Sequence, residues 1–293
     1  LSMGAKSTQS GVGTVREVVD SGAAQLRAAT ASPRREAELL LSYLLHRPRL
    51  FLLAHPEHEL SSVERRGYQG LVRRRAAGEP LPYITGRIEF YGFDFAVTPA
   101  VLIPRPETEL LVDEALAWLD VHRCRRAVEV GTGSGCIATT LAVRVPELRV
   151  TATDISASAL QVARRNAVRH GVAGRLNFVQ GDLLAPLAGP LELLLSNPPY
   201  VAEHEWDALP TSVRKEPRTA LLAGPEGLDV IRRLLLQAAQ RLLPGGLLLV
   251  EIGERHEGAV RALAEETFPS AQVEIKPDLA GKARLLRICV AAS

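Results

Sequence analysis

The tetrad Asn197-Pro198-Pro199-Tyr200 contains the residue types in this sequence that most directly suggest chemistry. Proline fixes φ and has no backbone N–H, so the loop is rigid and offers two acceptors, the Asn197 side-chain oxygen and the Pro198 carbonyl. Both oxygens could accept hydrogen bonds from one planar NH₂ group and so direct its lone pair at an electrophile. An amide nitrogen is a poor nucleophile because its lone pair is delocalised, and accepting both protons favours the pyramidal, reactive form. Tyr200 could pack on the flat face of such a substrate, and catalysis would then depend on positioning and electrostatics.

A glycine-rich turn, Gly131-Thr132-Gly133-Ser134-Gly135, is the second candidate site. Its pattern is G-x-G-x-G, and Cys136 stands where the dinucleotide fingerprint needs a third glycine. Glycines allow a tight turn and a close approach of a ligand to the backbone. Glu129, two residues before the turn, would repel a pyrophosphate and suits a cationic amine instead. Taken alone, the turn could also be a tight connection without a ligand.

Two further acids follow the next two apolar segments. Asp154 stands where a carboxylate can accept both hydroxyls of a ribose, and Asp182 could hold an adenine amino group. Either acid alone could be a solvated residue at a strand end. Together with the turn, they predict a nucleoside without phosphates and with an amino-acid tail, S-adenosylmethionine, which leaves as S-adenosylhomocysteine after methyl transfer. The predicted cofactor-binding residues are Glu129, Gly131, Thr132, Gly133, Gly135, Asp154, Ile155, Asp182, Leu183 and Asn197.

The elements that must position these loops alternate between strand and helix from Pro104 onward. Helical periodicity separates short apolar runs, and such an alternation indicates a mostly parallel sheet with helices on both faces. We therefore predict an α/β fold with a mostly parallel seven-stranded sheet. Strands are expected at residues 126–130, 150–153, 176–180, 191–196, 247–252, 272–276 and 284–290.

The front of the chain predicts helices. Ser32-Pro33 is a helix start signal, and the segment from Ser61 to Glu64 fits a capping box that opens a helix ending near Gly78. The aromatic stretch around Gly92 indicates a β-hairpin, although a plain connecting loop is an alternative. The expected organisation is a disordered lead-in (1–14), a helical domain (15–85), a β-hairpin linker (86–103) and an α/β domain (104–293).

Composition excludes several classes of protein. The 293 residues carry 35 Lys and Arg against 33 Asp and Glu, and this near balance argues against a protein held to nucleic acid mainly by charge. Residues 1–85 are more basic, with twelve Lys and Arg against eight Asp and Glu, a net charge of +4. No apolar run reaches the roughly 18 residues of a membrane helix, and the N-terminus lacks the apolar core of a secretory signal. Three cysteines without a C-x-x-C pair predict no metal site and no disulfide framework, hence a cytoplasmic protein.

These motifs resemble the class I S-adenosylmethionine-dependent methyltransferases. The resemblance implies that residues 104–293 form a Rossmann-like class I methyltransferase domain. More narrowly, the chain is similar to the HemK/PrmC family, the glutamine methyltransferases of peptide-chain release factors. The resemblance covers nearly the whole chain, and its most specific part is the stretch from Leu102 to Glu109 combined with the Asn-Pro-Pro-Tyr tetrad. The other matching segments are residues 80–86, 90–92, 131–135, 216–221 and 227–228.

The family resemblance implies a substrate and a role for each residue. The substrate would be the glutamine of the Gly-Gly-Gln motif in class 1 release factors, methylated on its side-chain amide nitrogen. The helical front domain would dock the release factor, and we expect a monomer with no membrane and no stable nucleic-acid partner. The residues implied are Asn197, Pro198 and Tyr200 as catalytic, with Pro199, Arg105, Pro106, Glu107 and Thr108 joining them in substrate binding.

Two other functions fit parts of the pattern. A nucleic-acid methyltransferase acting on an adenine or guanine amine would share the tetrad, but it must flip its base or take a single strand. The nearly neutral body of the chain and the scarcity of aromatic residues after Tyr200 weigh against it. A non-catalytic binding module would not require the tetrad. The run Arg73-Arg74-Arg75 is either a patch for a partner or a solvated helix face.

Overall fold

The computed structural model describes residues 13–291 and divides the chain at Thr85 into two compact units. Each unit has a hydrophobic core of its own. Residues from Val15 to Ile84 form the core of the first unit, and residues from Phe90 to Ile288 form two core clusters in the second.

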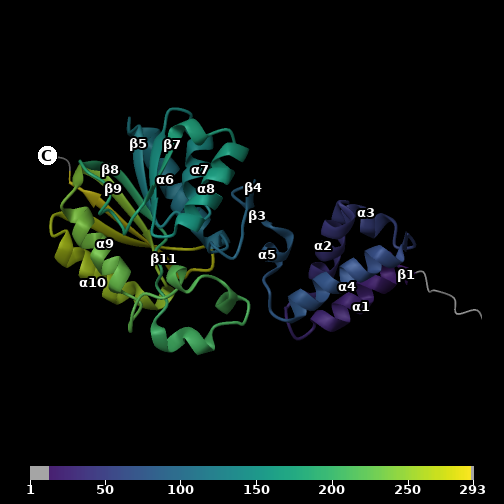
Figure 1. The fold of residues 1–293 in the computed structure, drawn as a ribbon. Coiled ribbons are helices and arrows are strands. Elements are labelled where there is room, and N and C mark those ends of the chain that lie inside the picture. Colours follow the sequence, from purple (N-terminus) through teal and green to yellow (C-terminus); the bar gives the residue numbers. More distant parts are fainter. Residues whose placement is uncertain (1–12, 292–293) are drawn as a thin grey trace, which may run out of the picture. The chain divides into compact units, whose positions relative to one another are not determined.

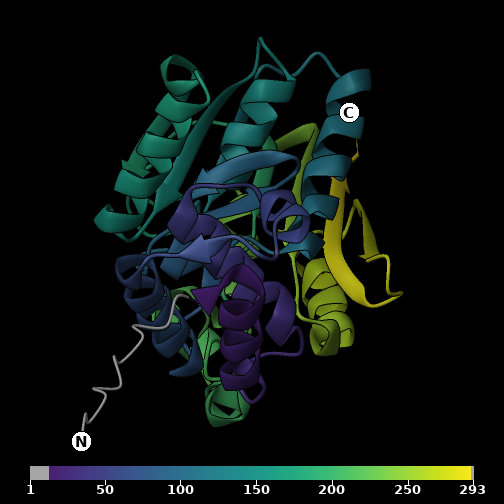
Figure 2. The same ribbon diagram turned by 90° about the vertical axis from the view of Figure 1, so that its right-hand side faces the viewer.

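The first unit is a bundle of short helices, drawn in purple and blue (Figures 1 and 2). Apolar residues at helical spacing, among them Val19, Leu26, Leu40, Tyr68 and Val72, meet in its core because each helix buries one face. The helices are α1 (Val15–Leu26), α2 (Pro33–Leu45), α3 (Arg49–Ala54), α4 (Ser62–Ala76) and α5 (Leu81–Thr85).

The predicted starts of these helices are largely confirmed. Ser61 and Glu64 cap α4 reciprocally, as the sequence predicts, and Thr14 and Glu17 form the same box at α1. Ser32 occupies the N-cap of α2 and Pro33 its first turn, but the Ser32 side chain makes no capping hydrogen bond.

The expected disordered lead-in extends too far. Residues 1–12 lie outside the described part of the chain, but Gly13 and Thr14 are ordered as strand β1 (Gly13–Thr14). They pair antiparallel with strand β2 (Glu59–Leu60), and the Thr14 side chain caps α1. Backbone pairing and capping therefore fix these two residues.

The predicted hairpin consists of β3 (Arg87–Phe90) and β4 (Phe93–Ala96). Tyr91 and Gly92 have φ of 54° and 76°, as a two-residue hairpin turn requires. The hairpin belongs to the second unit, where Phe90 and Phe95 are buried in its core.

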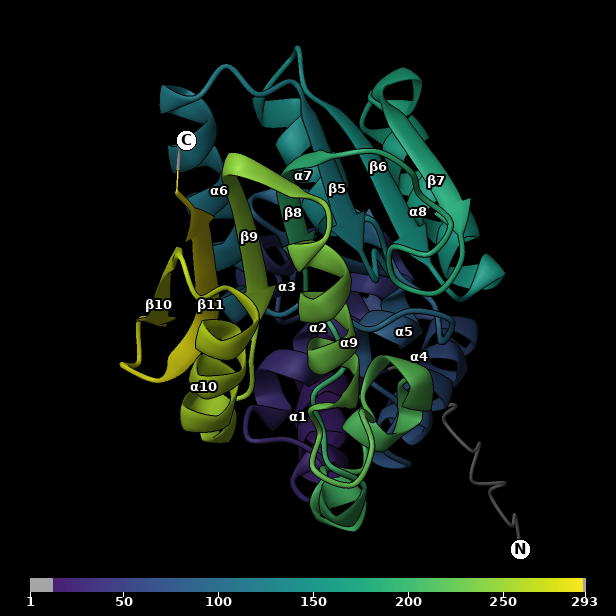
Figure 3. The same ribbon diagram turned by 90° about the vertical axis from the view of Figure 1, so that its left-hand side faces the viewer.

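Seven strands form the sheet of the second unit, in the order β10-β11-β9-β8-β5-β6-β7 (Figures 1 and 3). Strand β11 is antiparallel to both neighbours, and the other neighbouring pairs are parallel. Apolar runs such as Leu193–Leu195 are fully buried because both faces of the sheet are covered there. The strands are β5 (Arg126–Val130), β6 (Arg149–Asp154), β7 (Leu176–Gln180), β8 (Leu191–Ser196), β9 (Leu242–Glu251), β10 (Ala271–Pro277) and β11 (Ala283–Val290).

Helices cover both faces of this sheet. Residues of α6 (Glu109–Val121), α7 (Cys136–Arg144) and α8 (Ala157–Arg169) share one core cluster with the strands. Residues of α9 (Asp229–Ala239) and α10 (Glu257–Thr267) share the other. The chain returns from the edge strand β7 to β8, beside β5, so the direction of winding reverses between β5 and β8. Ligands bind at such a switch point, outside the carboxyl ends of the strands.

One predicted boundary is wrong. The strand expected at residues 247–252 starts earlier than predicted, since β9 begins at Leu242, before Pro244, shortly after α9 ends at Ala239. Leu242 pairs with Leu191, and the register shifts between Leu191 and Leu193. This irregularity lets the strand include the Pro-Gly-Gly segment at residues 244–246.

Candidate active site

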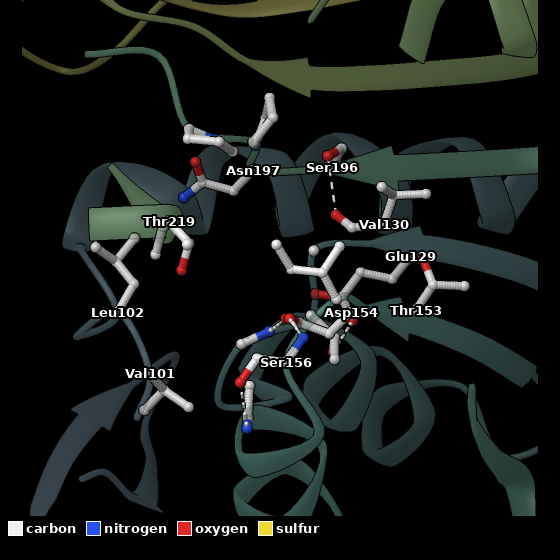
Figure 4. Close-up of a pocket in the computed structure, with 18 of the residues that line it drawn as sticks. Val101, Leu102, Glu129, Val130, Thr153, Asp154, Ser156, Ser196, Asn197 and Thr219 are labelled. Carbon is white, nitrogen blue, oxygen red and sulfur yellow. Dashed lines mark hydrogen bonds between the residues drawn. The ribbon is translucent and has the colours of Figure 1, made fainter. Parts of the chain in front are cut away.

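A cavity of about 320 Å³ opens at the carboxyl ends of β5, β6, β7 and β8. Asn197 and Asp154 lie on opposite walls, with Val101, Leu102 and Thr219 along another side (Figure 4). Of the predicted site residues, the wall includes Thr108, Glu129, Gly131, Thr132, Gly133, Asp154, Ile155, Asp182, Leu183, Asn197, Pro198 and Pro199.

The three glycines of the turn have different environments, although all have positive φ (74°, 54° and 76°). A Cβ on Gly135 would lie 2.9 Å from Ala163 Cβ, so Gly135 allows α7 to pack against α8. A Cβ on Gly133 would meet no protein atom within 4 Å, and one on Gly131 only Asn197 O at 3.8 Å. Gly131 and Gly133 therefore leave open space above the backbone for a ligand.

Asn166 holds the glycine-rich turn in place through side-chain hydrogen bonds. Its side chain is fully buried on α8, and its Oδ1 accepts from Ala96 N at 2.8 Å. Its Nδ2 donates to Ala96 O at 2.9 Å and to Ser134 O at 2.8 Å. One amide thus joins the hairpin to the glycine-rich turn.

Glu129 is buried beneath the turn, with 1% of its surface exposed. Its Oε2 accepts from Thr132 Oγ1 at 2.8 Å and from Ala138 N at 3.1 Å, whereas its Oε1 has no partner among the described residues. Burial raises the pKa of Glu129 to about 8, against the opposing effect of these two hydrogen bonds. An orphaned carboxylate oxygen of this kind favours a cationic ligand group.

Asp154 ends β6 and is part of the same wall. Its Oδ2 accepts from Gly133 N and its Oδ1 from Ser156 N, both at 2.9 Å. Each carboxylate oxygen has a second lone pair, so Asp154 keeps the capacity to accept two hydroxyl groups. Burial raises the pKa of Asp154, and these backbone donors lower it.

Asp182 and Leu183 follow β7 at the far end of the cavity. Asp182 forms an ion pair with Arg233 of α9, which also lines the cavity, and the side chain of Asp182 is about half exposed. Leu183 has a φ of 51° and is buried.

Asn197 begins the tetrad and is linked to a buried chain of hydrogen bonds. Its Nδ2 donates to Thr108 Oγ1 at 3.1 Å, and Thr108 Oγ1 donates to Glu251 Oε2 at 2.6 Å. The Tyr200 hydroxyl donates to Glu251 Oε1 at 3.3 Å. Burial raises the pKa of Glu251 to about 6, while Thr108, Arg284 and Tyr200 lower it. Burial also raises the pKa of the Tyr200 hydroxyl, so this group is a neutral donor.

Several predicted residues do not reach the cavity wall. Arg105 forms a 2.5 Å ion pair with the buried Glu216, which also accepts from Ile103 N at 2.9 Å. This pair fastens the segment before α6 to the loop that follows β8. Pro106 and Glu107 are exposed, and Gly135 packs against α8. Tyr200, the last residue of the tetrad, is half-buried and packs against the core cluster that contains α9 and α10.

Sequence reasoning did not assign a role to Glu251. It ends an apolar strand at the same sheet edge as Asp154, so the signal that identifies Asp154 also applies to Glu251. Its partner Thr108 is 143 positions earlier in the chain, and no spacing rule connects the two. Within residues 13–291, no cluster of three or more His, Cys, Asp or Glu could hold a metal ion, and no helix has the length and hydropathy of a membrane span.

Comparison with known proteins agrees with this architecture. A family model described as PrmC N-terminal domain matches residues 17–86, and one described as methyltransferase small domain matches residues 107–216. The T. thermophilus 16S rRNA N2 G1207 methyltransferase, solved with AdoMet and guanosine, has a TM-score of 0.51 at 17% identity over 70% of this chain and 49% of that chain. This likeness concerns the fold, and the predicted class I methyltransferase fold is confirmed.

The full-length relatives are more specific. The release factor glutamine methyltransferase of Moorella thermoacetica is 45% identical over 92% of this chain and 96% of its own length. That of Koribacter versatilis is 42% identical over 93% and 97%. The chain belongs to the release factor glutamine methyltransferase family.

Proposed function

We propose that this protein transfers a methyl group from S-adenosylmethionine to the side-chain amide nitrogen of the glutamine in the Gly-Gly-Gln motif of class 1 peptide-chain release factors. The proposal rests mainly on the Asn197 side chain. Its NH₂ group donates a hydrogen bond to Thr108 beside a nucleoside-sized cavity. Its amide oxygen is thus left as an acceptor at the cavity wall. Membership of the family supports the same substrate.

The described residues fit the proposed cofactor. The open space above Gly131 and Gly133 suits a ligand that lies against the backbone, and the orphaned Glu129 Oε1 suits its amino group. Asp154 retains acceptor capacity for ribose hydroxyls, and Asp182 and Leu183 would border the adenine. When bound, S-adenosylmethionine supplies an electrophilic methyl group on a sulfonium.

The tetrad would bind and orient the substrate amide. Asn197 Oδ1 and the Pro198 carbonyl accept its two N–H groups, which directs the nitrogen lone pair at the methyl carbon. The N–C bond forms as the S–C bond breaks, the sulfur keeps the electron pair, and the alkylated nitrogen then loses one proton. Because that proton becomes acidic on alkylation, positioning and electrostatics suffice.

The helical unit would dock the release factor. Its net charge of +4 and its own core make it a separate surface for a protein partner. Pro106 and Glu107 are exposed beside the buried Thr108, so we propose that they contact the protein substrate at the mouth of the cavity.

A methylation assay with labelled S-adenosylmethionine tests the proposal. The acceptors are a release factor, the same factor with Gly-Gly-Ala in place of Gly-Gly-Gln, and duplex DNA. We expect label on the unaltered factor alone. Label on DNA or on the Gly-Gly-Ala factor, with none on the unaltered factor, would contradict the proposal.

Asn197→Ala tests the role of the tetrad. We expect kcat to fall by about 100-fold or more, with the cofactor Kd nearly unchanged, because the lost oxygen faces the substrate. Asn177→Ala on the exposed surface of β7 is the matched control and retains activity. A large loss of cofactor affinity in Asn197→Ala would assign Asn197 to the cofactor instead.

A further inference from the structure

Resting on the proposed function, we infer that Thr108 and Glu251 are positioning residues that hold the Asn197 amide with its oxygen, and not its NH₂ group, toward the substrate nitrogen. Neither residue has to touch the substrate. They act through one hydrogen-bonded chain that runs from β9 to the tetrad.

The direction of this chain follows from counting protons. An ionised Glu251 can only accept, so the 2.6 Å contact with Thr108 uses the single hydroxyl proton of Thr108. Thr108 Oγ1 can then only accept from the Asn197 atom 3.1 Å away, and that atom must be Nδ2. The amide oxygen of Asn197 therefore faces the other way.

Burial of the hydrogen-bonded chain stabilises this orientation of the Asn197 amide. Thr108 and Glu251 are each 2% exposed, so water does not offer the hydroxyl another acceptor at low cost. The second oxygen of Glu251 accepts from the Tyr200 hydroxyl at 3.3 Å. Both Glu251 oxygens are thus engaged by donors, which holds the carboxylate in place as the acceptor for the Thr108 hydroxyl.

A reversed Asn197 amide would oppose the reaction in two ways. Its oxygen would face the Thr108 oxygen without a proton between them, and its NH₂ group would face the NH₂ group of the substrate. A reversed site would instead suit a carboxylate, which accepts hydrogen bonds and donates none. Discrimination between a glutamine and a glutamate side chain therefore reports the orientation of Asn197.

Thr108→Val removes the hydroxyl and keeps the shape of the side chain. With a release factor as substrate, we expect kcat/KM to fall roughly 10- to 100-fold, with the cofactor Kd unchanged. For a release factor carrying Gly-Gly-Glu we measure the inhibition constant Ki. The ratio of the KM for the Gly-Gly-Gln factor to this Ki should be higher for the variant than for the unaltered enzyme. Thr108→Ser retains the hydroxyl and should restore both activity and discrimination.

Thr139→Val is the matched control. Thr139 is fully buried on α7, and its hydroxyl has no partner among the described residues, so this substitution should leave activity and discrimination unchanged. Glu251→Leu tests the other end of the chain. It frees the Thr108 proton to donate to Asn197, and we expect the same shift toward Gly-Gly-Glu inhibition.

The outcomes separate the two proposals. If the unaltered enzyme labels no Gly-Gly-Gln factor, the proposed function fails. If it does, but Thr108→Val matches it in kcat/KM and in discrimination, the positioning role fails alone. Two other results would make Thr108 a structural residue and also overturn the inference. In the first, Thr108→Ser does not restore the activity that Thr108→Val loses. In the second, Thr108→Val loses cofactor affinity while its discrimination is unchanged.

Discussion

Burial raises the pKa of two acidic residues, Glu129 in the cavity wall and Glu251 in the hydrogen-bonded chain that ends at Asn197. Glu129 and Glu251 both lie almost without exposed surface, and burial raises the pKa of the first to about 8 and of the second to about 6. The difference reflects their donors and charges, because Arg284 faces Glu251, whereas Asp154 is the charged neighbour of Glu129. Glu129 therefore has the greater tendency to ionise in response to a cationic ligand.

We expect S-adenosylmethionine to bind more tightly as the pH rises from 6 to 7.5. Glu129, with a pKa of about 8, is mostly protonated over this range, and a ligand ammonium group beside it would lower that pKa. Binding then releases up to one proton, so Kd should fall by at most about tenfold per pH unit. The range ends below the pKa of about 7.7, at which half of the free α-amino groups have lost their own proton. Calorimetry in buffers of different ionisation enthalpy would count the protons released.

Glu129→Gln should bind the cofactor more weakly and with a flatter pH profile, because it cannot ionise. Glu89→Gln, on the exposed surface of β3, should keep the profile of the unaltered protein. An unaltered protein whose Kd does not depend on pH would show that Glu129 does not face the ligand amine.

At the scale of elements, parallel topology explains how much of the site the sequence could predict. The carboxyl ends of parallel strands share one sheet edge, so Asp154, Asp182 and Asn197 could be placed together from their positions after apolar runs. The same reasoning could not pair Thr108 with Glu251, because that contact depends on how α6 packs beside β9. Likewise, the start of β9 depends on a register shift against β8 that has no local signal.

The run Arg73-Arg74-Arg75 shows the same limit on α4. Successive residues of a helix point about 100° apart, so three identical side chains meet three environments. Arg73 is exposed, and Arg74 pairs with Glu79 at 2.6 Å. Arg75 is buried, pairs with Glu36 of α2 at 2.5 Å and donates to Ala29 O at 3.0 Å. The solvated-face interpretation is therefore wrong for Arg75.

Arg75→Ala should destabilise the helical unit by about 3 kcal/mol, because it leaves the Glu36 charge largely buried without its partner. Urea unfolding followed by far-UV circular dichroism would measure the loss. Both tryptophans, Trp118 and Trp206, lie in the second unit, so their fluorescence reports that unit separately and should keep its midpoint. Arg73→Ala on the exposed face should change stability by less than about 0.5 kcal/mol. Equal effects of the two substitutions would show that the ion pair adds nothing to stability.

At the scale of the whole molecule, the separate cores predict that the two units have separate functions. The core of the helical unit contains residues 15–84 alone, and every residue of the cavity wall lies in the second unit. Cofactor binding and methyl transfer can therefore be properties of residues 86–293, while the helical unit would add affinity for a whole release factor. Two contacts with one partner raise apparent affinity because the second becomes intramolecular.

Residues 86–293 expressed alone should test this division. A unit with its own core can fold alone, so we expect the cofactor Kd to remain within about threefold of that of the full chain. For a whole release factor, KM should rise at least about tenfold through the lost second contact. A short peptide containing Gly-Gly-Gln is the matched substrate, because it is too small to reach a docking surface, and both proteins should methylate it with similar kcat/KM. If the shortened protein methylated the whole factor with an unchanged KM, the helical unit would have no docking role, and the glutamine chemistry at Asn197 would be unaffected by that result.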